Sequence, residues 1–281
     1  MIQKSYEKDT GVLYLVPTPI GNLKDITNRA IEVLSKVDII FAEDTRVTKQ
    51  LLKFLNIKNE VVACHKFNES KMMKVAIELL NDGNNIALVT DRGTPLISDP
   101  GSLVVSEVIK NNHSVVALPG ACAFVPALAM SNISADKFLF YGFLNSKDSQ
   151  AIKELEMLKN INFTIVLYEA PHRLIKTLQN IYKVLENRII SISREISKLH
   201  EEVYRGDVIG ALKFYNNPIG EFVIVIQKNE SNHIVDYDKY VIEVKRLIEL
   251  GLRSNDAIKE VAKNNEISKN ELYEYYQRSK K

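Results

Sequence analysis

Charged residues of both signs directly follow three apolar runs of the sequence, at residues 43–46 (EDTR), 169–173 (EAPHR) and 194–195 (RE). A carboxylate in such a place can accept a proton from a reacting hydroxyl group. Each cluster can equally be a capped helix start or an internal ion pair, because purely structural pairs share the same residue types. The position that the three clusters share, each at the end of an expected strand, favours a functional role.

A longer polar loop follows another apolar run. Residues 86–89 (IALV) lead into residues 90–101 (TDRGTPLISDPG), which contain two aspartates, two glycines and two prolines. A helical pattern begins at Ser102, so the order is strand, loop, helix. In open α/β sheets ligands bind beyond the carboxyl ends of the strands, which makes this loop a candidate binding loop. An ordinary strand-to-helix connection is the alternative.

Two shorter loops rich in proline and glycine also follow expected strands, at residues 17–21 (PTPIG) and 119–120 (PG). If the three loops meet at one sheet edge, their free backbone N–H and C=O groups can bind an adenine edge or ribose hydroxyls, and Asp91 adds a charged acceptor. Neither a G-x-G-x-x-G motif nor a P-loop is present. The sequence therefore predicts a nucleoside pocket without a phosphate cradle.

Composition narrows the class of protein. The chain has 281 residues, 46% hydrophobic and 26% charged, with a net charge of +2, which is typical of a folded globular protein. Cys64 and Cys122 have no C-x-x-C spacing, and His65, His113 and His233 have no partners at ligand spacing, so we expect no metal site. The polar N-terminus and the lack of a long apolar stretch predict a cytoplasmic protein without a membrane span.

The elements that must position these residues alternate between strands and helices. Strands are expected at residues 12–16, 37–42, 86–89 and 114–118, with amphipathic helices between them, which indicates a mainly parallel sheet covered on both faces. A second region is expected to repeat this alternation, with strands at 162–168, 189–193 and 220–226. We therefore expect α/β domains at 1–143 and 144–230, with a linker at 229–236.

Residues 237–281 have an all-helical pattern instead. Gly251 is expected to end one helix, Ser254 to open a second, and residues 268–271 (SKNE) form a capping-box pattern for a third. Three short helices with tight connections are typical of a helix-turn-helix module. The segment holds ten basic and eight acidic residues. This balance leaves nucleic-acid binding and a plain packing or dimerisation role equally open.

Five stretches together resemble one family. They are residues 13–23 (LYLVPTPIGNL), 42–46 (AEDTR), 91–101 (DRGTPLISDPG), 118–120 (LPG) and 167–173 (LYEAPHR). In combination they are similar to the bacterial small-subunit ribosomal RNA ribose 2′-O-methyltransferase I family, within the tetrapyrrole-methylase superfamily. The resemblance covers residues 11–228, and the helical tail resembles the family's small C-terminal domain. Arg92 and Ala121 depart from it, since the family usually has alanine and proline there.

The resemblance implies two α/β domains of the class III methyltransferase type with S-adenosylmethionine bound between them. It also implies a homodimer that methylates a cytidine ribose in the decoding region of 16S rRNA, on the small ribosomal subunit. Residues that match cofactor-lining positions or their loops are Pro19, Ile20, Asp91, Thr94, Pro119, Gly120, Cys122, Ala123 and Tyr168.

Within this resemblance, three carboxylates are unranked candidates for accepting the hydroxyl proton: Glu43, Asp44 and Glu169. Four basic residues are candidates for contacts with RNA: Arg46, Arg92, His172 and Arg173. Two other functions stay open. One is a tetrapyrrole C-methyltransferase of the same fold, against which the 43–46 and 169–173 motifs argue, and the other is a non-catalytic RNA-binding assembly factor.

Overall fold

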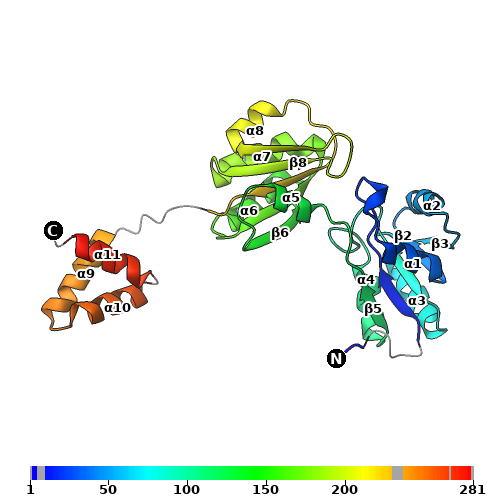
Figure 1. Cartoon of the computed structure of the whole chain (residues 1–281), viewed down its shortest axis with the longest axis horizontal. Coiled ribbons are helices and arrows are strands. Elements are labelled where there is room, and N and C mark those ends of the chain that lie inside the picture. Colours follow the sequence, from blue (N-terminus) through cyan, green and yellow to red (C-terminus); the bar gives the residue numbers. More distant parts are fainter. Residues whose placement is uncertain (1, 5–9, 230–236, 266, 280–281) are drawn as a thin grey trace. The chain divides into compact units, whose positions relative to one another are not determined.

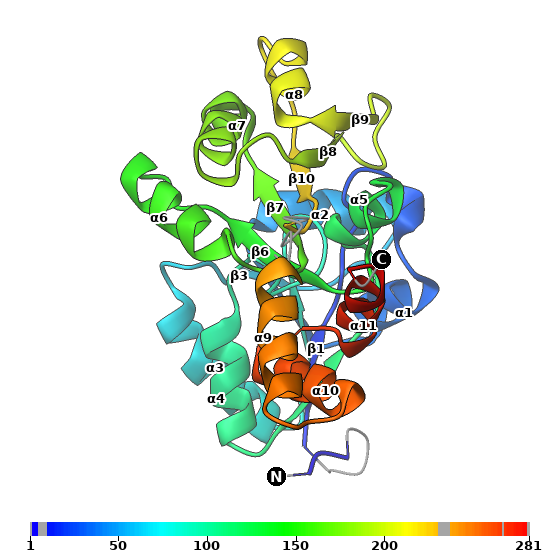
Figure 2. The ribbon, with the colours of Figure 1, turned by 90° about the vertical axis from the view of Figure 1, so that its left-hand side faces the viewer.

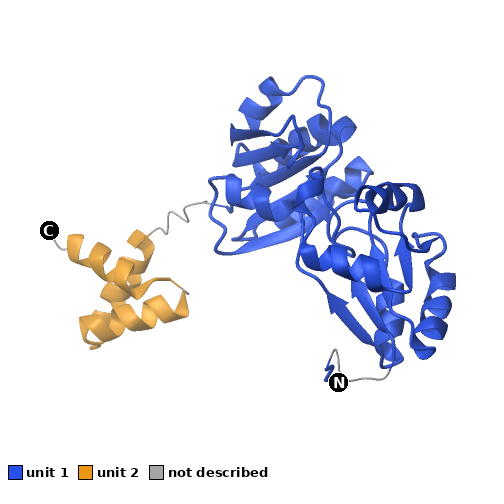
Figure 3. Ribbon diagram, turned by 45° about the vertical axis from the view of Figure 1, so that its right-hand side comes forward, with its two compact units in different colours: residues 1–229 blue, residues 230–281 orange. Residues whose placement is uncertain are grey.

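The computed structural model describes residues 2–4, 10–229, 237–265 and 267–279 (Figure 1). The chain divides into two compact units, residues 1–229 and 230–281 (Figure 3). Apart from Asn229, the linker expected at 229–236 lies outside the described residues. The first unit contains two five-stranded sheets.

All strands of the first sheet are parallel. They are β1 (Val12–Leu15), β2 (Ile39–Ala42), β3 (Val61–Ala63), β4 (Ile86–Val89) and β5 (Ser114–Ala117), in the order β3-β2-β4-β1-β5. Parallel pairing brings the loops after β1, β2 and β4 to one edge, as the sequence predicts. The short strand β3 was not predicted, because its three residues give too little periodicity to detect.

Helices cover both faces of this sheet, which confirms the predicted layering. Helices α1 (Asn28–Lys36) and α2 (Thr45–Phe54) pack on the face that carries Ala87 and Val89. Helices α3 (Glu69–Asn81) and α4 (Ser102–Lys110) lie side by side on the face that carries Ile86 and Leu88 (Figures 1 and 2). All four residues of β4 are buried, although neighbouring residues point to opposite faces, as expected for a strand covered on both sides.

The second sheet is mixed, which corrects the expected repeat of the first pattern. Its strands are β6 (Phe138–Phe143), β7 (Thr164–Glu169), β8 (Ile189–Arg194), β9 (Glu202–Asp207) and β10 (Phe222–Ile226), in the order β6-β7-β10-β8-β9. Only β6 and β7 pair in parallel. The seven-residue connection between β8 and β9 is too short for a parallel crossover, so these strands pair antiparallel.

Four helices pack on this second sheet. Helices α6 (Asp148–Leu158), α7 (Pro171–Leu185) and α8 (Val208–Phe214) share one core with it, and α5 (Phe124–Met130) covers the other face. Strand β6, placed at the end of the first region from the sequence, pairs with β7 of the second sheet. The division of the unit at 143 and 144 stays a prediction.

The second unit is a three-helix bundle around its own core: α9 (Tyr237–Glu249), α10 (Ser254–Asn264) and α11 (Lys269–Arg278). Gly251 has φ +101°, the left-handed conformation that ends α9 as predicted. The Ser268 hydroxyl accepts from the Glu271 N–H at 3.4 Å, while the Glu271 carboxylate accepts from Tyr237 of α9 at 2.8 Å. In the described part of the chain, no helix is long and apolar enough to cross a membrane.

Candidate functional site

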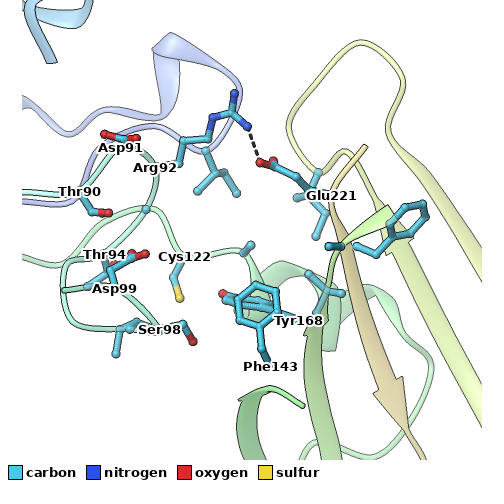
Figure 4. Close-up of a pocket in the computed structure, with 18 of the residues that line it drawn as sticks. Thr90, Asp91, Arg92, Thr94, Ser98, Asp99, Cys122, Phe143, Tyr168 and Glu221 are labelled. Atoms are coloured by element: carbon cyan, nitrogen blue, oxygen red, sulfur yellow. Dashed lines mark hydrogen bonds and ion pairs between the residues drawn. The ribbon is translucent and has the colours of Figure 1, made fainter. Parts of the chain in front are cut away.

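A pocket of about 650 Å³ lies where the loops of the first sheet meet the second sheet (Figure 4). Its walls come from the loops after β1, β2, β4 and β5, and from strand ends of the second sheet, β7 and β10. Eight of the predicted cofactor and proton-acceptor residues line it: Ile20, Glu43, Asp91, Thr94, Cys122, Ala123, Tyr168 and Glu169. The volume is within the usual range for small-molecule sites.

Backbone contacts fix the loops that build the pocket. Thr18 and Gly93 exchange two backbone hydrogen bonds, of 2.9 and 3.0 Å, which join the loop after β1 to the loop after β4. Gly93 has φ +90°, so this bridge requires a residue that tolerates the left-handed conformation. The Thr94 hydroxyl donates to the Ala121 carbonyl at 2.9 Å and joins the loop after β5 to the same wall.

Three of the predicted cofactor residues lie outside this lining. A Cβ atom on Gly120 would come within 2.6 Å of the Pro17 side chain, so the Pro119–Gly120 turn supports the wall from behind. Pro19 lines a neighbouring pocket instead. The turn was predicted to line the cofactor pocket, but it packs closely against Pro17 of the loop after β1 instead.

Three carboxylates form an acidic side of the pocket around Thr90: Glu43, Asp91 and Asp99. The Thr90 hydroxyl donates to Glu43 Oε2 at 2.8 Å, and the Asp44 N–H donates to Asp91 Oδ1 at 3.0 Å. Burial raises the pKa of Asp99 to about 6, and the neighbouring Glu43 and Asp91 carboxylates add to the rise. Burial likewise raises the pKa of Asp91. Within the described residues, none of the three has a salt-bridge partner within 4 Å.

An aromatic side faces these carboxylates from the second sheet (Figure 4). The Tyr168 ring lies edge-on to Phe143 and Phe140, with ring centroids 5.6 and 4.9 Å apart. The Tyr168 hydroxyl accepts from the Phe124 N–H at 3.2 Å. Burial raises the pKa of Tyr168 and of the Cys122 thiol, so both side chains are neutral at physiological pH. The pocket thus combines an acidic wall with a neutral, aromatic one.

Glu169 is held in an internal ion pair. Its carboxylate is almost fully buried and lies 3.3 Å from Arg173 Nε. It also accepts from the Thr177 hydroxyl at 2.5 Å and from the Ala170 N–H at 2.8 Å. Arg173 in turn donates to the Leu144 carbonyl at 2.7 Å. These contacts support the structural alternative for the 169–173 cluster, because both charges already have partners.

Asp44 and Arg46 also pair with each other. Asp44 caps α2, which begins at Thr45. Its carboxylate accepts from the Arg46 N–H at 2.8 Å and from Arg46 Nη2 at 2.6 Å, and these bonds hold its pKa at about 2. Both residues lie outside the pocket lining, as does the exposed His172 in the first turn of α7.

Arg92 lies at the rim of the pocket and forms a charged network with the second sheet. Its Nη1 atom is 2.5 Å from Glu221 Oε1, and Lys198 Nζ lies 2.6 Å from Glu221 Oε2 and 2.8 Å from Glu195 Oε1. Two cations and two anions therefore compensate one another. Sequence analysis missed Glu221, Phe143 and Asp99 as pocket residues. Only Asp99 had a local signal, its place in the long loop after β4.

The comparisons with known proteins agree with this architecture. The family model for Tetrapyrrole (Corrin/Porphyrin) Methylases matches residues 12–209. Solved structures with the same fold include a uroporphyrin-III-C-methyltransferase from Thermus thermophilus, with a TM-score of 0.54, 18% identity, and coverage of 78% of this chain and 92% of that one. A diphthine synthase matches with a TM-score of 0.60 and 12% identity, over 77% and 90% of the chains. At these identities the likeness shows the fold alone.

Relatives at higher identity define the family more closely. The Bacillus subtilis protein named Ribosomal RNA small subunit methyltransferase I is 42% identical, over 96% of this chain and 95% of its own length. The Haemophilus influenzae protein of the same name is 40% identical, over 95% and 96%. Both alignments include the helical C-terminal unit, since they span nearly the whole chain. The chain therefore belongs to the ribosomal RNA small subunit methyltransferase I family, within the tetrapyrrole methylases.

Proposed function

We propose that this protein is an S-adenosylmethionine-dependent methyltransferase that modifies the 2′-hydroxyl of a cytidine ribose in the decoding region of 16S rRNA. The observation that carries the proposal is the pocket's acidic wall of Glu43, Asp91 and Asp99, in a chain that belongs to the small-subunit rRNA methyltransferase I family. The tetrapyrrole alternative is not favoured, because the close relatives carry the rRNA enzyme's name.

The pocket fits the proposed cofactor chemically. When bound, S-adenosylmethionine supplies an electrophilic methyl group on a positively charged sulfonium. Carboxylates without lysine or arginine partners in the described structure favour a cation in a partly buried site. The loop backbone near Thr94 and Ala123 offers N–H and C=O groups of the kind that bind an adenine edge. The aromatic wall offers the apolar surface that a nucleoside buries.

Glu43 is the best placed of the three candidate proton acceptors. It lines the pocket, and its hydrogen-bond partner among the described residues is the Thr90 hydroxyl rather than a cation. Asp44 is engaged by Arg46, and Glu169 by Arg173 and Thr177. A carboxylate that already accepts from a cation is a weaker base, because the cation stabilises its charged form. We assign proton acceptance to Glu43, while Asp44 and Glu169 hold the starts of α2 and α7.

RNA contacts are proposed for the exposed basic residues. Arg46 and His172 lie on the first turns of α2 and α7, which begin beside the pocket. Arg173 has the less suitable geometry, because its guanidinium already contacts Glu169 and the Leu144 carbonyl. The resemblance also implies a homodimer, and the sequence predicts a cytoplasmic protein. We retain both as part of the proposal. Light scattering of the purified protein tests the oligomeric state.

The decisive experiment measures methyl transfer from radiolabelled S-adenosylmethionine to purified 30S subunits that lack the modification, to naked 16S rRNA and to a porphyrinoid. We expect labelling of the ribosomal substrate, mapped to a single cytidine ribose. Calorimetry with S-adenosylmethionine accompanies it, since a pure RNA-binding factor need not bind the cofactor. Labelling of the porphyrinoid alone, or no cofactor binding, would overturn the proposal.

A further inference from the structure

A second pocket, of about 460 Å³, borders the first one. The two pockets share four residues at their junction: Val47, Thr90, Asp91 and Arg92. The remaining walls of this junction pocket come from the loop after β1, from helix α2 and from the loop after β8. A molecule bound in it would therefore lie directly beside a ligand held in the first pocket.

Three solvent-exposed apolar side chains gather on this junction pocket. Leu23 is 40% exposed, Val47 38% and Phe54 58%. On α2, the residues Val47, Gln50, Leu51 and Phe54 follow the spacing i, i+3, i+4 and i+7, so they share one helix face. Water-facing positions of a helix normally carry polar residues, and an apolar stripe beside a pocket indicates a binding surface.

The charged wall opposite is electrically balanced. Arg92 and Lys198 line the junction pocket. Arg92 is paired with Glu221, and Lys198 is paired with both Glu221 and Glu195, so neither cation is free. A phosphate group would have to displace these carboxylates. A neutral, flat group meets no such obstacle and gains contact with an exposed aromatic ring. The chemistry of the pocket thus fits a nucleobase better than an RNA phosphate.

On the basis of the proposed function, we infer that the junction pocket binds the base of the acceptor nucleotide, stacked on the ring of Phe54. A ribose hydroxyl must lie close to the methyl donor, so its own base has to occupy space that borders the donor pocket. Bases that are read in single-stranded RNA commonly stack on aromatic side chains. Gln50 lies one helical turn before Phe54, and its amide can both donate to and accept from a base edge.

The test uses the full-length protein with Phe54 replaced by Ala, Leu or Tyr, and with purified unmodified 30S subunits and S-adenosylmethionine. Three quantities are measured: kcat/KM for 30S subunits, binding of 30S subunits in the presence of S-adenosylhomocysteine, and the calorimetric Kd for S-adenosylmethionine. Phe67→Ala is the matched control, since Phe67 is 94% exposed and lines neither pocket. Thermal melting confirms that each variant is folded.

For Phe54→Ala we expect kcat/KM for 30S subunits to fall about 5- to 100-fold, the range expected for losing one base–aromatic stack. Binding of 30S subunits should weaken with it, and the Kd for S-adenosylmethionine should stay within about twofold. The fall in kcat/KM should be smaller for Phe54→Tyr, which keeps an aromatic ring, than for Phe54→Leu, which keeps only an apolar side chain. The Phe67→Ala control should match the unaltered protein.

Three results would overturn the base pocket: an unchanged Phe54→Ala enzyme, equal losses for Phe54→Leu and Phe54→Tyr, or a Kd for S-adenosylmethionine that rises as much as kcat/KM falls. The last result would place Phe54 in the donor site. If the unaltered protein itself transfers no methyl group to RNA, the proposed function fails and the base pocket with it. Normal transfer by both the unaltered protein and Phe54→Ala removes the base pocket alone.

Discussion

Arg92 and Glu221 form an ion pair across the mouth of the larger pocket, with 2.5 Å between Nη1 and Oε1 (Figure 4). The pair joins the loop after β4 to the residue directly before β10, so it links the two sheets. Their side chains are 54% and 60% exposed, and exposed pairs of this kind stabilise proteins little. The pair therefore sets the charge of the pocket rim rather than the stability of the fold.

Releasing Arg92 from Glu221 should strengthen RNA binding. We expect Glu221→Gln to lower the Kd for 30S subunits and to steepen its salt dependence by about one charge, because a free cation can contact a phosphate. Filter binding or cosedimentation between low and physiological salt measures both quantities. Glu78→Gln is the control, because Glu78 is exposed on α3 and forms no salt bridge within the described part of the chain. An unchanged salt slope would show that Arg92 does not reach RNA.

Asp99 should make the ligand-free protein less stable as the pH rises. Its folded pKa of about 6 lies above the value of an unfolded aspartate, so between about pH 4 and 6 the folded state binds more protons than the unfolded state. Protonated Asp99 therefore contributes fully to the free energy of unfolding below about pH 4. This contribution is lost as the pH rises through about 6, because the buried carboxyl group then ionises.

Asp99→Asn removes this loss. We expect it to raise the free energy of unfolding at pH 8 by on the order of 1–2 kcal/mol, after solvent screening is allowed for, with the difference vanishing near pH 4. Urea unfolding at a series of pH values measures it. If Asp99 helps to hold the cationic donor, the same variant binds S-adenosylmethionine more weakly at pH 8. A pH-independent difference would refute the assignment of a raised pKa.

Replacing Glu43 should affect catalysis, whereas replacing Glu169 should affect stability. We expect Glu43→Gln to lower single-turnover methyl transfer by about 10²- to 10⁴-fold, the usual contribution of a general base, with little change in stability. Glu169→Gln leaves Arg173 without its buried anion and should cost about 1–3 kcal/mol of stability. Transfer by the folded Glu169→Gln protein should remain.

Single-turnover rates at saturating 30S subunits and urea unfolding provide the two readouts. Undiminished transfer by Glu43→Gln would remove it as the proton acceptor. A strong loss of transfer by Glu169→Gln at normal stability would restore that residue as a candidate.

Gly120→Ala should disturb the pocket from behind. The added Cβ would come within 2.6 Å of the Pro17 ring, closer than atoms in folded proteins pack, so the loop after β5 must shift. We expect a loss of about 1–3 kcal/mol of stability and a weaker calorimetric affinity for S-adenosylmethionine. Gly83→Ala is the comparison, because its Cβ meets nothing within 4 Å and only the φ of +85° opposes it. Equal effects at both sites would mean that the contact with Pro17 has no role.

Much of the first sheet was predictable. The apolar runs of β1, β2, β4 and β5 are four residues long with helical patterns between them, and parallel strands buried on both faces have this signature. The end of α9 near Gly251 followed from the conformational freedom of glycine. The second sheet was predicted less well. Strand β9 was not predicted, and periodicity does not encode the antiparallel pairing of β10 with β7 and β8.

The loops that line the pocket could be recognised in the sequence, because prolines, glycines and aspartates at strand ends have local physical causes. Asp91 was placed in this way, while Ile20, Thr94 and Cys122 were placed by the family resemblance. The pairing of the charged residues depends instead on tertiary contacts. Glu169 and Glu43 have the same residue type and the same position after a strand, yet Arg173 and Thr177 engage the first, while a threonine hydroxyl contacts the second. Arg92 and Glu221 are 129 residues apart in the chain, and their pairing arises because the two sheets bring them together.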